Sequence, residues 1–156
     1  MKMRYSMEAD PDTTARAQVL EANISPKHSV EICREIRGME LQKAKGFLSD
    51  VIDMKRPLPF KRYKKKVGHR KGEGFGPGRY PQKAAKTFLK LLEDCESNAE
   101  YSGLNTDALF IKHIAAHRGR VYSGWMPRAH GRATDWDNHT VNIEIILEER
   151  EGDDGQ

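Results

Sequence analysis

Two segments near the C-terminal end of the chain alternate apolar and polar residues, but the segment that joins them does not. Residues 108–117 (ALFIKHIAAH) and 140–149 (TVNIEIILEE) have the period of two typical of β-strands, whereas 118–139 is largely glycine, arginine, tryptophan and short polar residues. If both sides of this hairpin stay extended, each is about 60 Å long at roughly 3.3 Å per residue, against about 17 to 20 Å for an ordinary strand. Because one small domain cannot cover that length, we expect the outer half to be an arm lying against another molecule.

Hydrophobic periodicity elsewhere predicts three helices in a single domain of 156 residues. Ser25 and the proline after it form a helix start signal, so the first helix is expected over about 26–37. A second helix is expected over about 41–56 and a third over about 81–103. We expect the first two to form a short αα-hairpin, and residues 1–24, whose periodicity is weak, to be an arm or a short edge strand.

Positive charge is concentrated in one stretch. Between Lys55 and Lys90 there are thirteen lysines and arginines but one acid, Glu73. Residues 55–80 carry prolines and alternating glycines, which predict an irregular loop, and long loops in compact domains are usually functional or disordered. The aromatic residues interleaved with these cations are Phe60, Tyr63, Phe75 and Tyr80.

This composition favours contact with RNA or DNA, because the aromatic rings can stack on unpaired bases while the cations neutralise phosphates. The alternative is a charged surface that faces only solvent. A nucleotide-binding loop is disfavoured, since no strand precedes the glycines and no Lys-Ser or Lys-Thr pair follows them.

The end of the predicted hairpin is basic. The segment MPRAHGRA (126–133) places Arg128 and Arg132 on either side of Ala-His-Gly, where the glycine permits a positive φ. Their planar guanidinium groups suit bidentate contact with phosphate. Trp125 and Trp136 lie almost symmetrically about the turn, as a cross-strand clasp or a base-stacking pair. We therefore predict that the tip is held by a polyanion.

Histidines are frequent in and beside the hairpin. His113 and His117 are four residues apart and point to the same side of either a strand or a helix, which is compatible with metal binding. No third ligand can be named from the spacing, so we expect these side chains to contact phosphate or bases, with no metal and no cofactor. The alternative is a nuclease or metal enzyme that uses His113, His117 and His139.

The cysteines and the chain ends bear on location. Cys33 and Cys95 lie in apolar-periodic stretches without CxxC spacing, so we expect reduced core thiols. No apolar run is long enough to span a bilayer, and the first residues do not resemble a signal peptide, so we expect a cytoplasmic protein. Acids dominate from Glu144 to Asp154, which predicts an acidic tail, assigned to 148–156, that meets basic proteins or solvent.

Several segments resemble one family. The tip, MPRAHGRA, is similar to the Met-Pro-Arg-Ala-Lys-Gly-Arg-Ala hairpin of the universal large-subunit ribosomal protein family twenty-two, in its archaeal and eukaryotic form, with His130 where lysine is frequent. The other segments that carry the resemblance are YSMEADPDTTARA (5–17), KHSVEICREIRG (27–38), LPFKRYKKKVGHRKG (58–72), GRYPQKAAKTFLKLLE (78–93), IKHIAAHRGR (111–120) and VNIEIILEE (141–149). The resemblance covers nearly the whole chain.

The resemblance implies an α+β fold, with a small antiparallel sheet packed with three helices and a long projecting β-hairpin threaded into ribosomal RNA. It implies a non-enzymatic constituent of the large ribosomal subunit that binds large-subunit ribosomal RNA, supports assembly and lines the nascent-peptide exit tunnel. The other partners implied are neighbouring ribosomal proteins and, transiently, the nascent polypeptide; a membrane and a homo-oligomer are not expected. The alternative is a free RNA-binding or RNA-chaperone module acting off the ribosome.

The predicted site follows from these interpretations, with a hairpin arm over about 107–149 and a basic loop over 55–80. The residues expected at the tunnel wall are Met126, Pro127, Arg128, Ala129, His130, Gly131 and Arg132. The residues expected to contact RNA are Lys61, Arg62, Lys64, Lys65, Lys66, His69, Arg70, Lys71, Arg79, Tyr80, Lys83, Lys112, His113, His117, Arg118, Arg120, Trp125, Arg128, His130, Arg132, Trp136 and His139.

Overall fold

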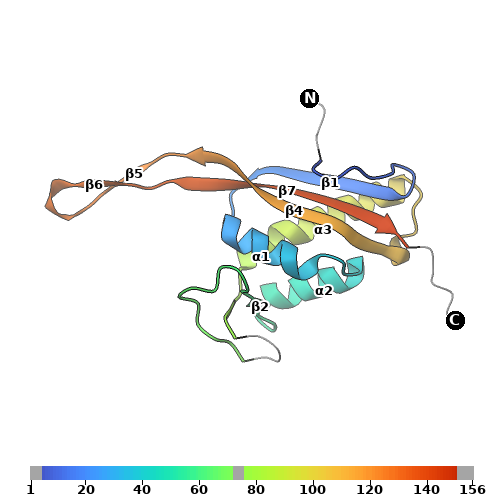
Figure 1. Cartoon of the computed structure of the whole chain (residues 1–156), viewed down its shortest axis with the longest axis horizontal. Helices are drawn as coiled ribbons and strands as arrows, with labels where there is room; N and C mark the ends of the chain where they lie inside the picture. The colour runs from blue at the N-terminus through green and yellow to red at the C-terminus, as the bar shows by residue number, and fades with distance from the viewer. Residues whose placement is uncertain (1–4, 72–75, 151–156) are drawn as a thin grey trace.

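A computed structural model describes residues 5–71 and 76–150 of the chain. Its centre is an antiparallel sheet of three strands, β1 (Thr14–Ala22), β7 (Asn138–Glu149) and β4 (Leu109–Tyr122), in that order. The helices α1 (Pro26–Ile36), α2 (Leu41–Ile52) and α3 (Gln82–Tyr101) lie on one side of the sheet, and the hairpin of β4 and β7 continues far beyond it (Figure 1). This arrangement confirms the expected α+β fold with a projecting β-hairpin.

The core forms where the helices meet the inner face of the sheet. Alternate residues of β7 point into it and are fully buried, namely Val141, Ile143, Ile145 and Leu147. The predicted apolar side of α3, including Phe88 and Leu92, is buried in the same cluster. Cys33 and Cys95 are buried thiols without a disulfide, as expected, and desolvation raises the pKa of each to about 12.

α1 and α2 do not form the expected αα-hairpin. α1 packs mainly against β4, whereas α2 packs mainly against α3. The link between them is bound to the sheet instead: the N–H of Gly38, whose φ is 78°, donates to the carbonyl of Ile111 (2.9 Å), and the Ile111 N–H donates to the carbonyl of Met39 (2.9 Å). The link is therefore held at the outer edge of β4, and the two helices that it joins pack against different elements.

The N-terminal part of the chain is an edge strand, the second of the two alternatives that the sequence allowed. β1 pairs with β7, with an irregularity between Val19 and Ala22. There Glu21 has a φ of 52°, and its N–H donates to Oδ1 of Asn142 (2.8 Å). The segment before β1 reaches the outer face of the sheet, where Ser6 contacts β7.

The basic loop is anchored at both ends and irregular between them. Two short strands, β2 (Leu58–Pro59) and β3 (Gly78–Arg79), pair with each other, and Leu58 is fully buried. Phe60 is 3% exposed and belongs to the core, so the prediction that it stacks on a base is wrong. Phe60 instead anchors the start of the loop in the core. Phe75 lies outside the described residues.

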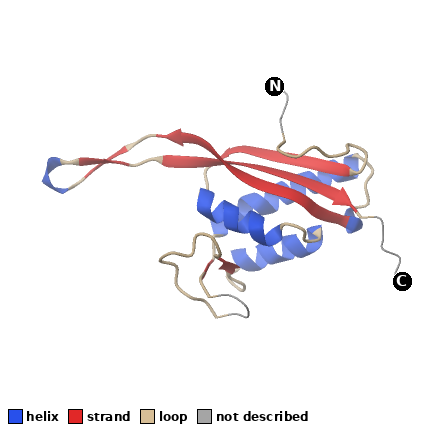
Figure 2. Cartoon of the chain, in the orientation of Figure 1, coloured by secondary structure: helices blue, strands red, loops and turns tan. Residues whose placement is uncertain are grey.

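Beyond the core the hairpin is an uncovered arm. No residue from 115 to 139 is buried. Pairing between β4 and β7 extends to Tyr122 and Asn138, after which β5 (Trp125–Pro127) pairs with β6 (Ala133–Asp135). A turn of 3-10 helix, Ala129–Gly131, closes the far end (Figure 2), and another, Thr106–Ala108, precedes β4.

Glycine is required within the arm because its two strands approach closely. A Cβ at Gly119 would lie 2.5 Å from Oγ1 of Thr140 and 3.0 Å from Oδ1 of Asn142. A side chain at this position would therefore push the strands apart at the root of the arm.

Candidate nucleic-acid interface

The tip of the arm is closed by a backbone hydrogen bond between its two arginines. The N–H of Arg128 donates to the carbonyl of Arg132 (2.7 Å). Between them Gly131 has the positive φ that was predicted (66°), and His130 has one as well (61°). Both arginines are exposed, so the turn holds two cations at the farthest point of the arm (Figure 1).

The two tryptophans do not clasp each other. Trp125 pairs with Asp135 across β5 and β6, while the backbone N–H of Trp136 donates to the carbonyl of Gly124 (2.7 Å). No contact between the two indole rings occurs in the part of the chain that the structure describes. The rings are 74% and 57% exposed, which leaves the second alternative, stacking on a base, as a prediction.

Arginines of the arm and the basic loop lie against aromatic rings. The guanidinium carbon of Arg120 is 5.7 Å from the ring centre of Tyr122, and that of Arg128 is 6.0 Å from Trp136. The same arrangement in the basic loop joins Arg62 to Tyr63, Arg70 to Tyr80 and Arg79 to Phe60. Contact with a ring orients a guanidinium group without neutralising its charge.

Acids of the chain compensate lysines but not arginines. Within residues 5–71 and 76–150, no arginine forms an ion pair with a carboxylate. The lysines that do are Lys43, Lys45, Lys55, Lys61 and Lys112. The arginine charge is therefore available to an anion outside the chain, and phosphate is the anion that the planar guanidinium fork matches.

A buried glutamate fixes the start of the basic loop. Glu31 of α1 is 1% exposed, and its carboxylate accepts hydrogen bonds from the N–H groups of Lys61 (3.2 Å), Arg62 (2.8 Å) and Tyr63 (2.7 Å). The predicted RNA-contacting residues that are exposed on this loop are Lys61, Arg62, Lys64, Lys65, Lys66, His69, Arg70, Lys71 and Arg79. The sequence did not indicate Glu31, because an acid on a helix normally faces solvent.

Three predicted RNA contacts are held by acids of the protein itself. Lys112 forms an ion pair with Glu148. Nε2 of His113 and Nε2 of His117 lie 3.2 Å and 3.3 Å from Oε1 of Glu144, which lies between them on the adjacent strand. The two histidines share one side of β4, as predicted, but that side is the outer face of the sheet. Their contact with RNA stays a prediction.

Glu144 does not belong to an acidic tail. It is 3% exposed and lies within β7, where the N–H and hydroxyl of Ser6 both donate to its carboxylate. Burial acts to raise the pKa of Glu144, but hydrogen bonds from Ser6 and then from the two histidines outweigh it and lower the pKa. Glu144 is the first residue of the acidic stretch, but it serves the sheet. Of the predicted tail, 148–156, Glu148 and Glu149 belong to β7, and residues 151–156 lie outside the described residues.

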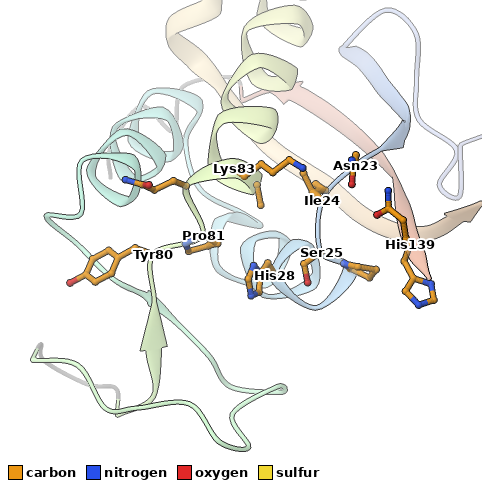
Figure 3. Close-up of a pocket in the computed structure, with 12 residues that line it drawn as sticks. Asn23, Ile24, Ser25, His28, Tyr80, Pro81, Lys83 and His139 are labelled. Atoms are coloured by element: carbon orange, nitrogen blue, oxygen red, sulfur yellow. The ribbon is translucent and has the colours of Figure 1, made fainter. Parts of the chain in front are cut away.

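Three predicted contacts meet at the root of the arm. Tyr80, Lys83 and His139 line a cleft of about 560 Å³ with His28, which the sequence did not indicate. Figure 3 shows that His28, Lys83 and His139 reach this cleft from α1, α3 and β7. Desolvation, and then the nearby charge of Arg79, lower the pKa of His28.

Cations of α1 were also missed. Lys27 and Arg34 are seven residues apart, the spacing that places two side chains on one face of a helix, and Arg37 follows at the helix end. This spacing was visible in the sequence, but only the apolar face of the helix was interpreted.

In the described ranges, no three metal-ligating side chains come together, and no helix has the length and apolar character needed to cross a membrane.

These features define a class: a basic α+β protein with an arm that has no buried residue and with arginines that form no ion pair among the described residues. Comparison with known proteins gives the family. The family model described as ribosomal protein L22p/L17e matches residues 17–148, and the chain belongs to this family.

The relatives are archaeal and cover nearly the full length. The large ribosomal subunit protein uL22 of Methanopyrus kandleri is 56% identical over 92% of this chain and 91% of its own. Those of Methanocella arvoryzae and Methanocaldococcus jannaschii are 51% and 52% identical, each over 95% of this chain and over 97% and 96% of their own.

Proposed function

We propose that the protein is a structural constituent of the large ribosomal subunit that binds large-subunit ribosomal RNA and supports subunit assembly. The observation that carries the proposal is the arm. It has no buried residue from 115 to 139, and its exposed arginines form no ion pair with a carboxylate of residues 5–71 and 76–150. RNA packed around the arm would supply both the missing surface and the missing negative charge. The names of the relatives, all large-subunit proteins, support this assignment.

The arm and the basic loop divide the RNA contacts between them. Arg120 and Arg128, already oriented by aromatic rings, bind phosphates, and Trp125 offers an exposed ring for base stacking. The loop is tied to α1 through Glu31, and it presents a second group of cations. Two groups of contacts fix the orientation of the domain on RNA.

The tip is proposed to reach the wall of the nascent-peptide exit tunnel. Its residues from Met126 to Arg132 are those that match the family's hairpin, and they lie at the end of the arm, where the growing chain would pass. His130 stands where the family often has lysine, so the tip has one permanent cation fewer.

The same proposal covers partners and location. The protein acts without catalysis, as a single copy bound to the ribosome in the cytoplasm, next to other ribosomal proteins and in transient contact with the nascent polypeptide.

Sedimentation tests the proposal. Cell lysate is separated on a sucrose gradient before and after a high-salt wash, and fractions are probed for the protein. Co-migration with large subunits through the wash is the expected result. Recovery at the top of the gradient would refute the ribosomal assignment in favour of an RNA-binding module acting off the ribosome.

A further inference from the structure

A groove rimmed by arginines runs between α1 and the outer edge of the sheet, at the root of the arm and away from the tip. It has a volume of about 400 Å³, and its rim carries Arg34 and Arg37 from α1 and its end, and Arg62 from the basic loop. Ala115 and Ala116 of β4 line its other side. The groove therefore joins three parts of the chain that are separate in the sequence.

The charge in this groove is uncompensated. All three arginines are exposed, and none has a carboxylate partner within the described ranges. Neither of the two acids of α1 lines the groove, because Glu31 binds the loop backbone and Glu35 lies 3.5 Å from Lys61.

Two of the guanidinium groups are oriented before any ligand binds. Nη2 of Arg37 donates to the carbonyl of Ile114 (2.8 Å) on the edge of β4, and Arg62 lies 5.6 Å from the ring centre of Tyr63. Each keeps further N–H donors for an anion, and such preorganisation reduces the entropy lost on binding.

A second hollow lies nearer the arm, with lining residues that are distinct from those of the groove. This hollow lies at the start of α1 and is lined by Lys27, Arg118 and His139. Lys27 and Arg34 are seven residues apart on one face of α1, about 10 Å along the helix axis. Cations therefore follow α1 from Arg118 at the root of the arm to Arg62 in the basic loop.

We propose that this groove and the hollow at the start of α1 hold a stretch of RNA backbone that connects the arm-bound RNA to the RNA on the basic loop. The inference rests on the proposed function and adds a site to it. Guanidinium groups on the rim match phosphate, and the side formed by Ala115 and Ala116 has no side-chain donor or acceptor with which to read a base. The contact is with the backbone and is independent of sequence.

The test uses the full-length protein and the organism's own large-subunit ribosomal RNA, transcribed in vitro. Affinity is measured over a range of salt concentrations for the wild type and for Arg34→Gln with Arg37→Gln. The matched control is Lys43→Gln with Lys45→Gln, which also removes two positive charges, from lysines of α2 paired with Glu40 and Glu96.

Loss of two phosphate contacts should lower the slope of log affinity against log salt by about 1.5. If variant and wild type bind equally at about 1 M salt, the variant should then bind about 30-fold more weakly than the wild type at about 0.1 M. The control pair should keep the wild-type slope. Because Arg37 also binds Ile114, a fold defect is separated by the single variant Arg34→Gln, which should lower the slope by about 0.7.

The outcomes separate the two proposals. If the wild type shows no salt-dependent affinity for this RNA, the proposed function itself fails. If the wild type binds and the groove variants keep its slope, the groove does not hold RNA and the inference is overturned. If those variants keep the slope but no longer co-migrate with large subunits on the sucrose gradient, the groove holds an acidic protein neighbour, which also overturns the inference.

Discussion

Replacing Glu31 with alanine should release the start of the basic loop and destabilise the domain. The carboxylate accepts hydrogen bonds from the N–H groups of Lys61, Arg62 and Tyr63. A hydrogen bond to a charged group contributes roughly 1.5 to 3 kcal/mol, but released N–H groups on an exposed loop regain water. We therefore expect a loss of about 3 to 4 kcal/mol in the free energy of unfolding. At about 2 to 4 °C per kcal/mol for a domain of this size, Tm should fall by about 10 °C.

Two further variants grade the effect. Glu31→Gln keeps an oxygen for Arg62 and Tyr63 but turns an NH2 group toward the N–H of Lys61, so it should lose about 1 to 2 kcal/mol. Glu35→Ala, one turn along α1, removes only a partly exposed ion pair with Lys61 at 3.5 Å and should lose less than about 1 kcal/mol.

Urea unfolding followed by circular dichroism gives the three free energies, and amide hydrogen exchange reports on residues 61–63 directly. The N–H groups of these residues should lose protection in Glu31→Ala and keep it in Glu35→Ala. If the two alanine variants unfold with equal free energies, or if protection survives in Glu31→Ala, Glu31 does not anchor the loop.

Three other predictions concern the arm and the sheet. Arg128→Glu with Arg132→Glu should leave the unfolding transition of the isolated protein unchanged but impair subunit assembly; a less cooperative melt would contradict the view that the tip lies outside the core. Gly119→Val should lower the free energy of unfolding by about 1 to 3 kcal/mol because its Cβ meets the neighbouring strand. Gly46→Ala, in open space on α2, should raise it by about 0.5 to 1 kcal/mol, and similar urea midpoints for the two variants would contradict this. The folded state lowers the pKa of Glu144 from 4.5, so its contribution to stability is present above pH 4.5 and is lost as the pH falls through the lower folded value. In Glu144→Gln, urea titrations at a series of pH values should show that the free energy of unfolding depends less on pH in this acid range. An unchanged pH dependence would contradict this.

Local patterns predicted the elements of the fold well. The stripe of apolar residues on α3 and the alternation in β7 were visible in the sequence because each reflects one buried face of one element. The arm was predicted from the opposite signal, the loss of alternation between 118 and 139. In each case the relevant property belongs to a single segment.

Contacts between distant segments were not predictable in the same way. The αα-hairpin was expected from two consecutive helices, but Gly38 and Met39 pair with Ile111, more than seventy residues away in the chain. Phe60 was interpreted from its basic neighbours, whereas its burial depends on where the loop is anchored.

The same distinction between local properties and long-range contacts applies to the candidate interface. Exposed cations of the loop and tip were identified from composition, which is a local property. The association of Arg34, Arg37 and Arg62 around one groove depends on how α1 lies against β4, and the partners of His113 and His117 depend on the register of β4 and β7. Charge could be located from the sequence, but its compensation could not.

The uncovered arm also has a consequence for copies that never assemble. Its extended backbone contains trypsin-type cleavage sites at Arg118, Arg120, Arg128 and Arg132, with no buried residue from 115 to 139 to protect them. We expect an unassembled copy to be cut in this region while its core stays folded, and an incorporated copy to be shielded. A protease would then remove surplus molecules because only these expose the arm, and the amount of the protein would be adjusted to that of its partners.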